Sequence, residues 1–208
     1  MPNMASGFRA GTMCRLTVGI ATVHLSKSDK MGVNEKEIYK MDIVFVPAKA
    51  NDAAAISTLR QRIWDTTYRG IYPDEVIDHF DHDWHQQRDL KKISAPSFTV
   101  YLIRDGEEDI GYFMFQDAGS GVRLCSLYVL REYQHRGIGK LAFSIITDYC
   151  RKKGISRFTC DCNPHNENAM RFYQRMGGVV IKTDTGHENQ QEDGVTFEFD
   201  GGIIGGES

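Results

Sequence analysis

The sequence predicts a single α/β domain whose mixed, mostly antiparallel central sheet of about seven strands is flanked by about four helices. Three observations lead to this prediction. The 208 residues suffice for one substantial core but not for two full domains. Two amphipathic segments, at residues 137–153 and 166–176, end at glycines as helices do. Short apolar runs lie around them, and the turn Asp105-Gly106 joins two of these runs as a hairpin.

Composition excludes several classes of protein. The chain is 41% hydrophobic and 25% charged with a net charge of -3, so no broad basic surface for nucleic acid is expected. No apolar run approaches the roughly 20 residues of a membrane span. The five cysteines form no regular framework, which favours a reduced, cytoplasmic protein.

Residues 1–40 differ from the rest of the chain. They are rich in Gly, Ser, Thr and Lys and show little periodicity. We expect a poorly structured extension at 1–40, a compact domain at 41–200 and a short tail at 201–208.

The first half of the domain begins with a strand at 42–47. A helix then starts at Asn51 or Asp52, carries apolar residues at helical spacing and is interrupted at Gly70. A polar helical region at 73–92 follows. The next segments alternate as strands do, at 98–103, 110–115 and 123–129.

The second half opens with the clearest helix, at 137–153. A short strand at 157–162 leads through Asn163-Pro164 into the helix at 166–176. Two final strands, at 179–182 and 195–199, flank a polar loop.

The turn before the clearest helix allows two interpretations. Gly137, Gly139 and Ala142 fit the dinucleotide pattern GxGxxG/A, and Asp161 even lies where its acid would. Gln134 with the two glycines equally fits QxxGxG, a pattern associated with acyl-coenzyme A. Glycines at a helix start favour phosphate in either case. The seven residues 130–136 between strand and glycines argue against the dinucleotide, as does the late place of the unit in the chain.

Two strings then carry a family resemblance. LYVLREYQHRGIGKLA at 127–142 and NENAMRFYQRMGG at 166–178 resemble the strand, glycine turn and NxxAxxFYxxxG helix of the GCN5-related N-acetyltransferase (GNAT) superfamily. The resemblance spans about residues 41–199. It implies an enzyme that transfers an acetyl group from acetyl-coenzyme A directly to an amine.

The resemblance also implies roles for particular residues. The turn from Gln134 to Lys140 would hold the pyrophosphate through its amides, and Asn166 would contact the cofactor arm or cap its helix. The implied cofactor-binding residues are Leu127, Tyr128, Val129, Gln134, His135, Arg136, Gly137, Ile138, Gly139, Lys140, Asn166, Ala169 and Tyr173.

Acetyl transfer also requires a proton donor and a proton acceptor. Tyr173 matches the family's general acid, which protonates the departing sulfur, and the alternative is that it only packs as a core aromatic on the helix face. The amide of Val129 could contact the oxyanion. Where relatives often place a glutamate as base, this chain has Arg123. Other groups could act through a water, and the sequence does not rank them: Asp161, His165 and Glu167.

The acceptor is the least determined part. Five early aromatic residues could line its pocket: Trp64, Tyr68, Tyr72, Phe80 and Trp84. The carboxylates of Asp78, Asp81 and Asp83 could attract a cationic amine. We therefore expect a small amine or a peptide amino terminus as acceptor, no nucleic-acid or membrane partner, and leave a homodimer open.

Three alternatives stay open from the sequence. A metal site at CDCNPH is disfavoured because Cys160 and Cys162 are only two apart and lack a second pair. A non-catalytic coenzyme A-binding module is suggested by Arg123. An NAD-dependent oxidoreductase is the most remote.

Overall fold

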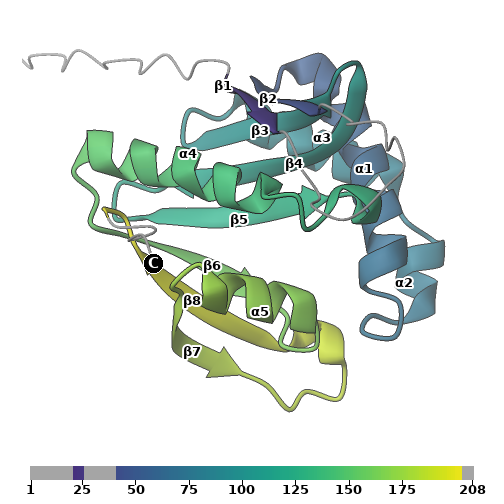
Figure 1. Cartoon of the computed structure of the whole chain (residues 1–208). Helices are drawn as coiled ribbons and strands as arrows, with labels where there is room; N and C mark the ends of the chain where they lie inside the picture. Colours follow the sequence, from purple (N-terminus) through teal and green to yellow (C-terminus); the bar gives the residue numbers. More distant parts are fainter. Residues whose placement is uncertain (1–20, 26–40, 203–208) are drawn as a thin grey trace, which may run out of the picture.

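The computed structural model describes residues 21–25 and 41–202 (Figure 1). Their strands form one sheet in the order β1-β2-β3-β4-β5-β6-β8-β7. Every neighbouring pair is antiparallel except β5 and β6, which are parallel. The bounds of the strands are β1 Ala21–Leu25, β2 Met41–Pro47, β3 Phe98–Asp105, β4 Glu108–Asp117, β5 Val122–Val129, β6 Arg157–Cys162, β7 Val179–Asp184 and β8 Gly194–Asp200.

The predicted fold class is confirmed, with one strand more than expected. That strand is β1, which pairs with β2 along Ala21–Leu25 and lies within the segment predicted to be poorly structured. The rest of residues 1–40, and residues 203–208, lie outside the described residues. The limits of the domain stay a prediction.

The described helices lie on both faces of the sheet. Figure 1 shows α4 and α5 on the near face, with α1 and α3 behind the other half. The two faces follow from the alternation along β3, where Tyr101 and Ile103 join one core cluster and Val100 and Leu102 the other. The bounds of the helices are α1 Ala53–Thr67, α2 Asp74–Asp78, α3 His82–Ser94, α4 Ile138–Lys153 and α5 Glu167–Arg175.

The helical region predicted at 73–92 is two helices, so this prediction was wrong in its continuity. The predicted helix is interrupted before Asp81, where a new helix begins. The carboxylate of Asp81 accepts a hydrogen bond from the amide of Trp84 at 2.8 Å and so caps the start of α3. Phe80, just before it, is 8% exposed and stacks on His85 with ring centroids 4.2 Å apart. The chain therefore bends to bury Phe80 at the cost of one helical turn.

The elements that the resemblance uses fold as predicted. Gly137 begins α4 in the left-handed conformation, with φ of 82°, and Gly154 ends it at 70°. β6 has the predicted bounds, and its Cys160 and Cys162 are both buried on the face that α5 covers. Asn166 caps α5, since its side chain accepts a hydrogen bond from the amide of Ala169 at 3.1 Å.

Candidate active site

The sheet opens between β5 and β6. The two strands pair at only three positions, from Val122 with Phe158 to Leu124 with Cys160, and then diverge (Figure 1). A cavity of about 760 Å³ occupies the opening. It is lined by residues 124–129 of β5, the glycine turn, α5 along its whole length and the end of α1, so the predicted motifs converge on one space.

The turn before α4 is held against β5. The side-chain amide of Gln134 donates a hydrogen bond to the carbonyl of Val129 at 3.0 Å. Gly137 begins the helix without a side-chain cap, so the first amides of α4 are left for another acceptor. These amides and the positive end of the helix are a site for phosphate.

Most of the predicted cofactor residues line the cavity. From the turn these are Gln134, His135, Gly137, Ile138, Gly139 and Lys140, and from the other elements Leu127, Tyr128, Val129, Asn166, Ala169 and Tyr173. Arg136 is not among them. Its guanidinium lies 5.1 Å over the ring of Tyr133 and donates to the carbonyl of Glu132 at 2.6 Å, which directs it back onto the turn. Additional cations at the cavity wall are Arg131, Arg171 and Arg175.

Gly139 is required by packing as well as by any cofactor. A Cβ at this position would lie 2.8 Å from the ring of Phe172, closer than real contacts allow. The glycine thus lets the start of α4 approach α5, and this contact fixes the two walls of the cavity relative to one another.

The main chain of β5 presents an amide to the cavity. The amide of Leu130 donates to the carbonyl of Ile110 in β4 at 2.9 Å. The backbone N–H groups of successive residues in a strand point to opposite edges of that strand. The amide of Val129 therefore points away from β4 and into the opening. The carbonyl of Val129, on the same side, is the one that Gln134 binds.

Tyr173 lies on the opposite wall. It is 8% exposed, and burial, followed by the nearby thiols of Cys160 and Cys162, raises its pKa well above the usual value. The phenol therefore keeps its proton at neutral pH. It packs among aromatic rings as well, including Phe143 and Phe197, so both of its predicted roles fit the geometry.

The candidate bases differ in their ion-pair and hydrogen-bond partners and in whether they line the cavity. Asp161 forms an ion pair with Arg123 and accepts a hydrogen bond from Thr196 Oγ1 at 2.6 Å, and neither Arg123 nor Asp161 lines the cavity. Glu167 and His165 do line it. Glu167 is exposed and paired with Arg171, whereas His165 Nε2 lies 2.8 Å from Asp193 Oδ2.

Only one of the five predicted acceptor aromatics, Trp64, Tyr68, Tyr72, Phe80 and Trp84, lines the cavity. Tyr68 does, with its hydroxyl 3.4 Å from that of Tyr128. Trp64 and Tyr72 were expected there, but among the described residues they form an aromatic cluster beside it, with Trp64 in edge contact with Tyr68 and Tyr72 stacked on Tyr68. Hydrophobic burial of the large rings outweighs exposure to the cavity.

The predicted acidic wall is absent from the described part of the cavity. Asp78 pairs with Arg69, Asp81 caps α3, and neither they nor Asp83 line it. Several residues that line the cavity were not expected from the sequence.

Cys125 and Ser126 of β5 reach the cavity beside a β-bulge. The bulge arises because Met114 pairs with Ser126 whereas Phe115 pairs with Leu124, which leaves Cys125 as the extra residue. No sequence pattern marks that bulge.

The family model described as the acetyltransferase (GNAT) family matches residues 58–178, more than half of the chain. The chain belongs to this family. It is therefore an acetyltransferase with acetyl-coenzyme A as cosubstrate, which confirms the predicted enzyme class and favours coenzyme A over NAD.

Individual relatives of this GNAT protein act on different amines. A spermidine N(1)-acetyltransferase of Thermoplasma acidophilum is 26% identical over 151 residues, which are 69% of this chain and 92% of the relative. The crystal structure of the PaiA N-acetyltransferase of the same organism, in complex with coenzyme A, matches with a TM-score of 0.67 at 22% identity, covering 76% of this chain and 98% of its own. The ribosomal-protein-S18-alanine N-acetyltransferase of Escherichia coli matches with a TM-score of 0.60 at 14% identity, covering 78% and 96%.

Two kinds of feature are absent from the described residues. They contain no helix that is both long and apolar enough to cross a membrane. Nor do the side chains of residues 42–202 bring three His, Cys, Asp or Glu residues together as a metal would require.

Proposed function

We propose that the protein transfers the acetyl group of acetyl-coenzyme A directly to the primary amine of a small molecule or to a peptide amino terminus. The observation that carries this proposal is the single cavity between β5 and β6. It joins the glycine turn, the inward amide of Val129 and the protonated phenol of Tyr173. The relatives named for spermidine and for an alanine amino terminus both act on amines, which supports this acceptor class.

The proposed chemistry follows from these groups. The pyrophosphate binds at the turn from Gln134 to Lys140, and the arm of the cofactor lies along β5. A neutral amine attacks the thioester carbonyl, and the Val129 amide donates to the oxyanion that forms. The C–S bond then breaks, and Tyr173 gives its proton to the departing thiolate. The amine loses one proton to a base, for which His165 and Glu167 are the candidates at the cavity wall.

Replacing Tyr173 tests the mechanism. Tyr173→Phe keeps the buried ring and removes only the hydroxyl, and we expect kcat to fall by about 10²- to 10⁴-fold, as for the loss of a general acid. The assay follows the free thiol released from acetyl-coenzyme A when amine is added. Tyr149→Phe is the matched control, since the Tyr149 hydroxyl binds Asp117 at 2.8 Å and lies outside the cavity lining. An unchanged kcat in folded Tyr173→Phe would remove the acid role.

A further inference from the structure

A buried ion pair joins α1 to α3. Arg60 of α1 is 1% exposed and Asp89 of α3 is 0% exposed. Two hydrogen bonds join them, at 2.6 and 3.1 Å. His85 lies 3.3 Å from Arg60, and burial together with the Arg60 charge lowers its pKa to about 4, so it adds no charge at neutral pH. Both oxygens of Asp89 are thus taken up by Arg60.

Two further cations of α3, Arg88 and Lys92, lie near the same carboxylate, that of Asp89. Arg88 Nε is buried without a hydrogen bond, because Asp89 Oδ1 is 3.7 Å away. Lys92 Nζ reaches only the thioether of Met114, at 3.9 Å, and the face of the Phe98 ring, at 5.6 Å. Within residues 42–202 no other carboxylate forms an ion pair with either of them.

The surplus of positive charge is unfavourable in the structure as it stands. Burial lowers the pKa of Arg88, and repulsion from Arg60 adds to the effect. Burial likewise lowers the pKa of Lys92, and repulsion from Arg88 adds to it. Three cations against one carboxylate leave the positive charge of this half-buried place only partly compensated, even though Arg88 also lies 4.7 Å over the Trp84 ring.

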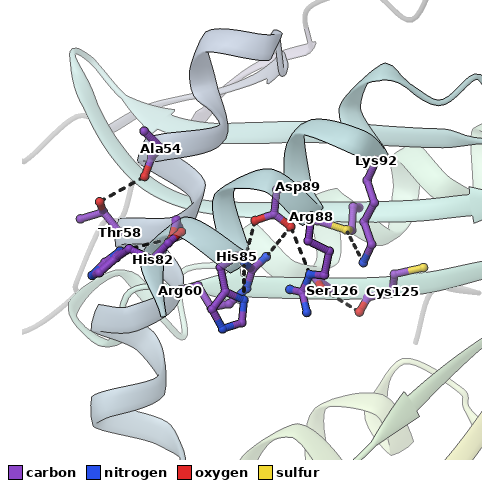
Figure 2. A network of polar contacts seen from close by, with 12 residues as sticks. Ala54, Thr58, Arg60, His82, His85, Arg88, Asp89, Lys92, Cys125 and Ser126 are labelled. Atoms are coloured by element: carbon purple, nitrogen blue, oxygen red, sulfur yellow. Dashed lines mark hydrogen bonds and ion pairs between the residues drawn. The ribbon is translucent and has the colours of Figure 1, made fainter. Parts of the chain in front are cut away.

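This surplus lies beside the cavity, behind its lining residues Cys125 and Ser126, and neither Arg88 nor Lys92 is itself a lining residue (Figure 2). Figure 2 shows Arg88 and Lys92 reaching from α3 to the level of Cys125 and Ser126 in β5. These two β5 residues line the cavity, and Arg123, followed by Lys92, opposes the rise that burial causes in the pKa of the Cys125 thiol. Lys92 therefore acts on the bulged part of β5 together with Arg123, whose own charge is paired with Asp161.

We infer that Arg88 and Lys92 bind a carboxylate of the acceptor, so that the acceptor is an amine that also carries a carboxylate, as an amino acid or an acidic peptide amino terminus does. A carboxylate would supply the missing charge-assisted hydrogen bonds and offset the repulsion. A polyamine would add positive charge at the same place and is disfavoured. The inference rests on the proposed amine acetylation and narrows its acceptor.

Matched pairs of acceptors test the inference. Alanine is compared with alaninamide, and the C-terminally amidated peptide Asp-Ala-Ala with the amidated peptide Asn-Ala-Ala, so that the acidic member of each pair carries one carboxylate and the other member carries none. We expect at least about a tenfold preference in kcat/KM for the acidic member of at least one pair, and spermidine to be a poor acceptor. The two pairs also separate amino acid from peptide as the source of the carboxylate. Equal rates within both pairs would overturn the inference.

A pair of lysine variants assigns the preference to the proposed site. Lys92→Met keeps the length of the side chain and removes the charge, and we expect it to abolish the preference through KM with little change in kcat. Lys91→Met is the same substitution at the exposed neighbouring residue and should keep the preference. Equal loss of preference in both variants would show a general charge effect and contradict the inference.

A binding measurement separates the inference from the proposed function. Alanine and alaninamide, and the two amidated peptides, are titrated by calorimetry into the protein saturated with free coenzyme A. Tighter binding of an acidic member without any thiol release in the assay would support the inference and refute the proposed activity. Thiol release from neutral amines, with no preference in binding or rate, would support the activity and refute the inference.

Discussion

At the scale of single residues, the Arg60–Asp89 pair is the most demanding contact of the fold. Removing one partner leaves the other charge buried and unpaired, which costs about 3–5 kcal/mol. We expect Asp89→Asn to lower the free energy of unfolding by about this amount in urea denaturation. Glu167→Gln, which breaks the exposed pair with Arg171, should cost about 1 kcal/mol or less. Similar losses in the two variants would contradict the view that burial gives the Asp89 pair its weight.

The histidines around Asp193 give the stability a pH dependence. A hydrogen bond with Asp193 raises the pKa of His187 above 6.5, and hydrogen bonds from His165 and His187 hold the pKa of Asp193 well below its usual value. A raised pKa means that the His187 contribution is complete below 6.5 and is lost as pH rises through the folded-state value. The Asp193 contribution is present above 3.8 and is lost only in acid.

The corresponding prediction compares pH profiles. The difference in unfolding free energy between the wild type and His187→Gln should shrink as pH rises from about 6 to about 9. His79→Gln is the control, because it removes an exposed histidine of the α2–α3 bend that is not bonded to Asp193. A difference that stays constant, or that grows with pH, would contradict the assigned role of the Asp193 hydrogen bond.

At the scale of elements, the contact between α4 and α5 depends on Gly139. Alanine is the better helix former, worth up to about 1 kcal/mol, but its Cβ would meet the Phe172 ring at 2.8 Å. That ring is itself packed 5.4 Å from Phe143, so it cannot move freely. We expect overpacking to win, with Gly139→Ala less stable by about 1–2 kcal/mol and with a raised KM for acetyl-coenzyme A.

The control for this contact is Gly121→Ala, since a Cβ at Gly121 would meet nothing within 4 Å. Its thermal midpoint and KM should stay close to those of the wild type. If Gly139→Ala behaved in the same way, close approach would not be the reason for glycine at that position.

The same elements show what sequence patterns can predict. Strong periodicity with glycine ends predicted α4 and α5 to within about a residue, and the Asp105-Gly106 turn predicted the β3–β4 hairpin. The prediction of one continuous helical region at 73–92 failed because its break depends on burying Phe80 against Trp64, a residue of another helix. Asp81 before a helical stretch was a local signal of that break.

In the candidate site, too, the residues placed by local motifs were predicted and those placed by the packing of distant elements were not. Local motifs identified the glycine turn and Asn166 because turn geometry and capping depend on neighbours in sequence. Trp64, Tyr72 and the acids of the acceptor region were misplaced because their surroundings depend on how α1, α2 and α3 pack. The Arg60–Asp89 pair and the cations beside it come from two helices and left no pattern in the sequence.

At the scale of the whole molecule, the sheet consists of two parts joined by a short seam. The three parallel pairs between β5 and β6 are the only ladder across it in the described sheet. The cavity begins where this seam ends, and its walls come from both parts, with β5 and α4 on one side and α5 on the other. A cofactor in the cavity would therefore link the two parts and stabilise the whole domain rather than one element.

Thermal unfolding with cofactor tests this view. Acetyl-coenzyme A at about 100 times its Kd should add about 2.7 kcal/mol, which raises the melting temperature by about 5–10 °C, and NAD should not. Gly137→Ala strains a residue whose φ is 82° and should lose much of the shift, because the strain displaces the phosphate-binding amides. Gly154→Ala imposes a similar strain at the far end of the same helix, where φ is 70°, and should keep the shift although both variants start from a lower melting temperature. A shift reduced equally in both variants would mean that the cofactor responds to the stability of α4 as a whole, and not to the geometry of the turn at its start.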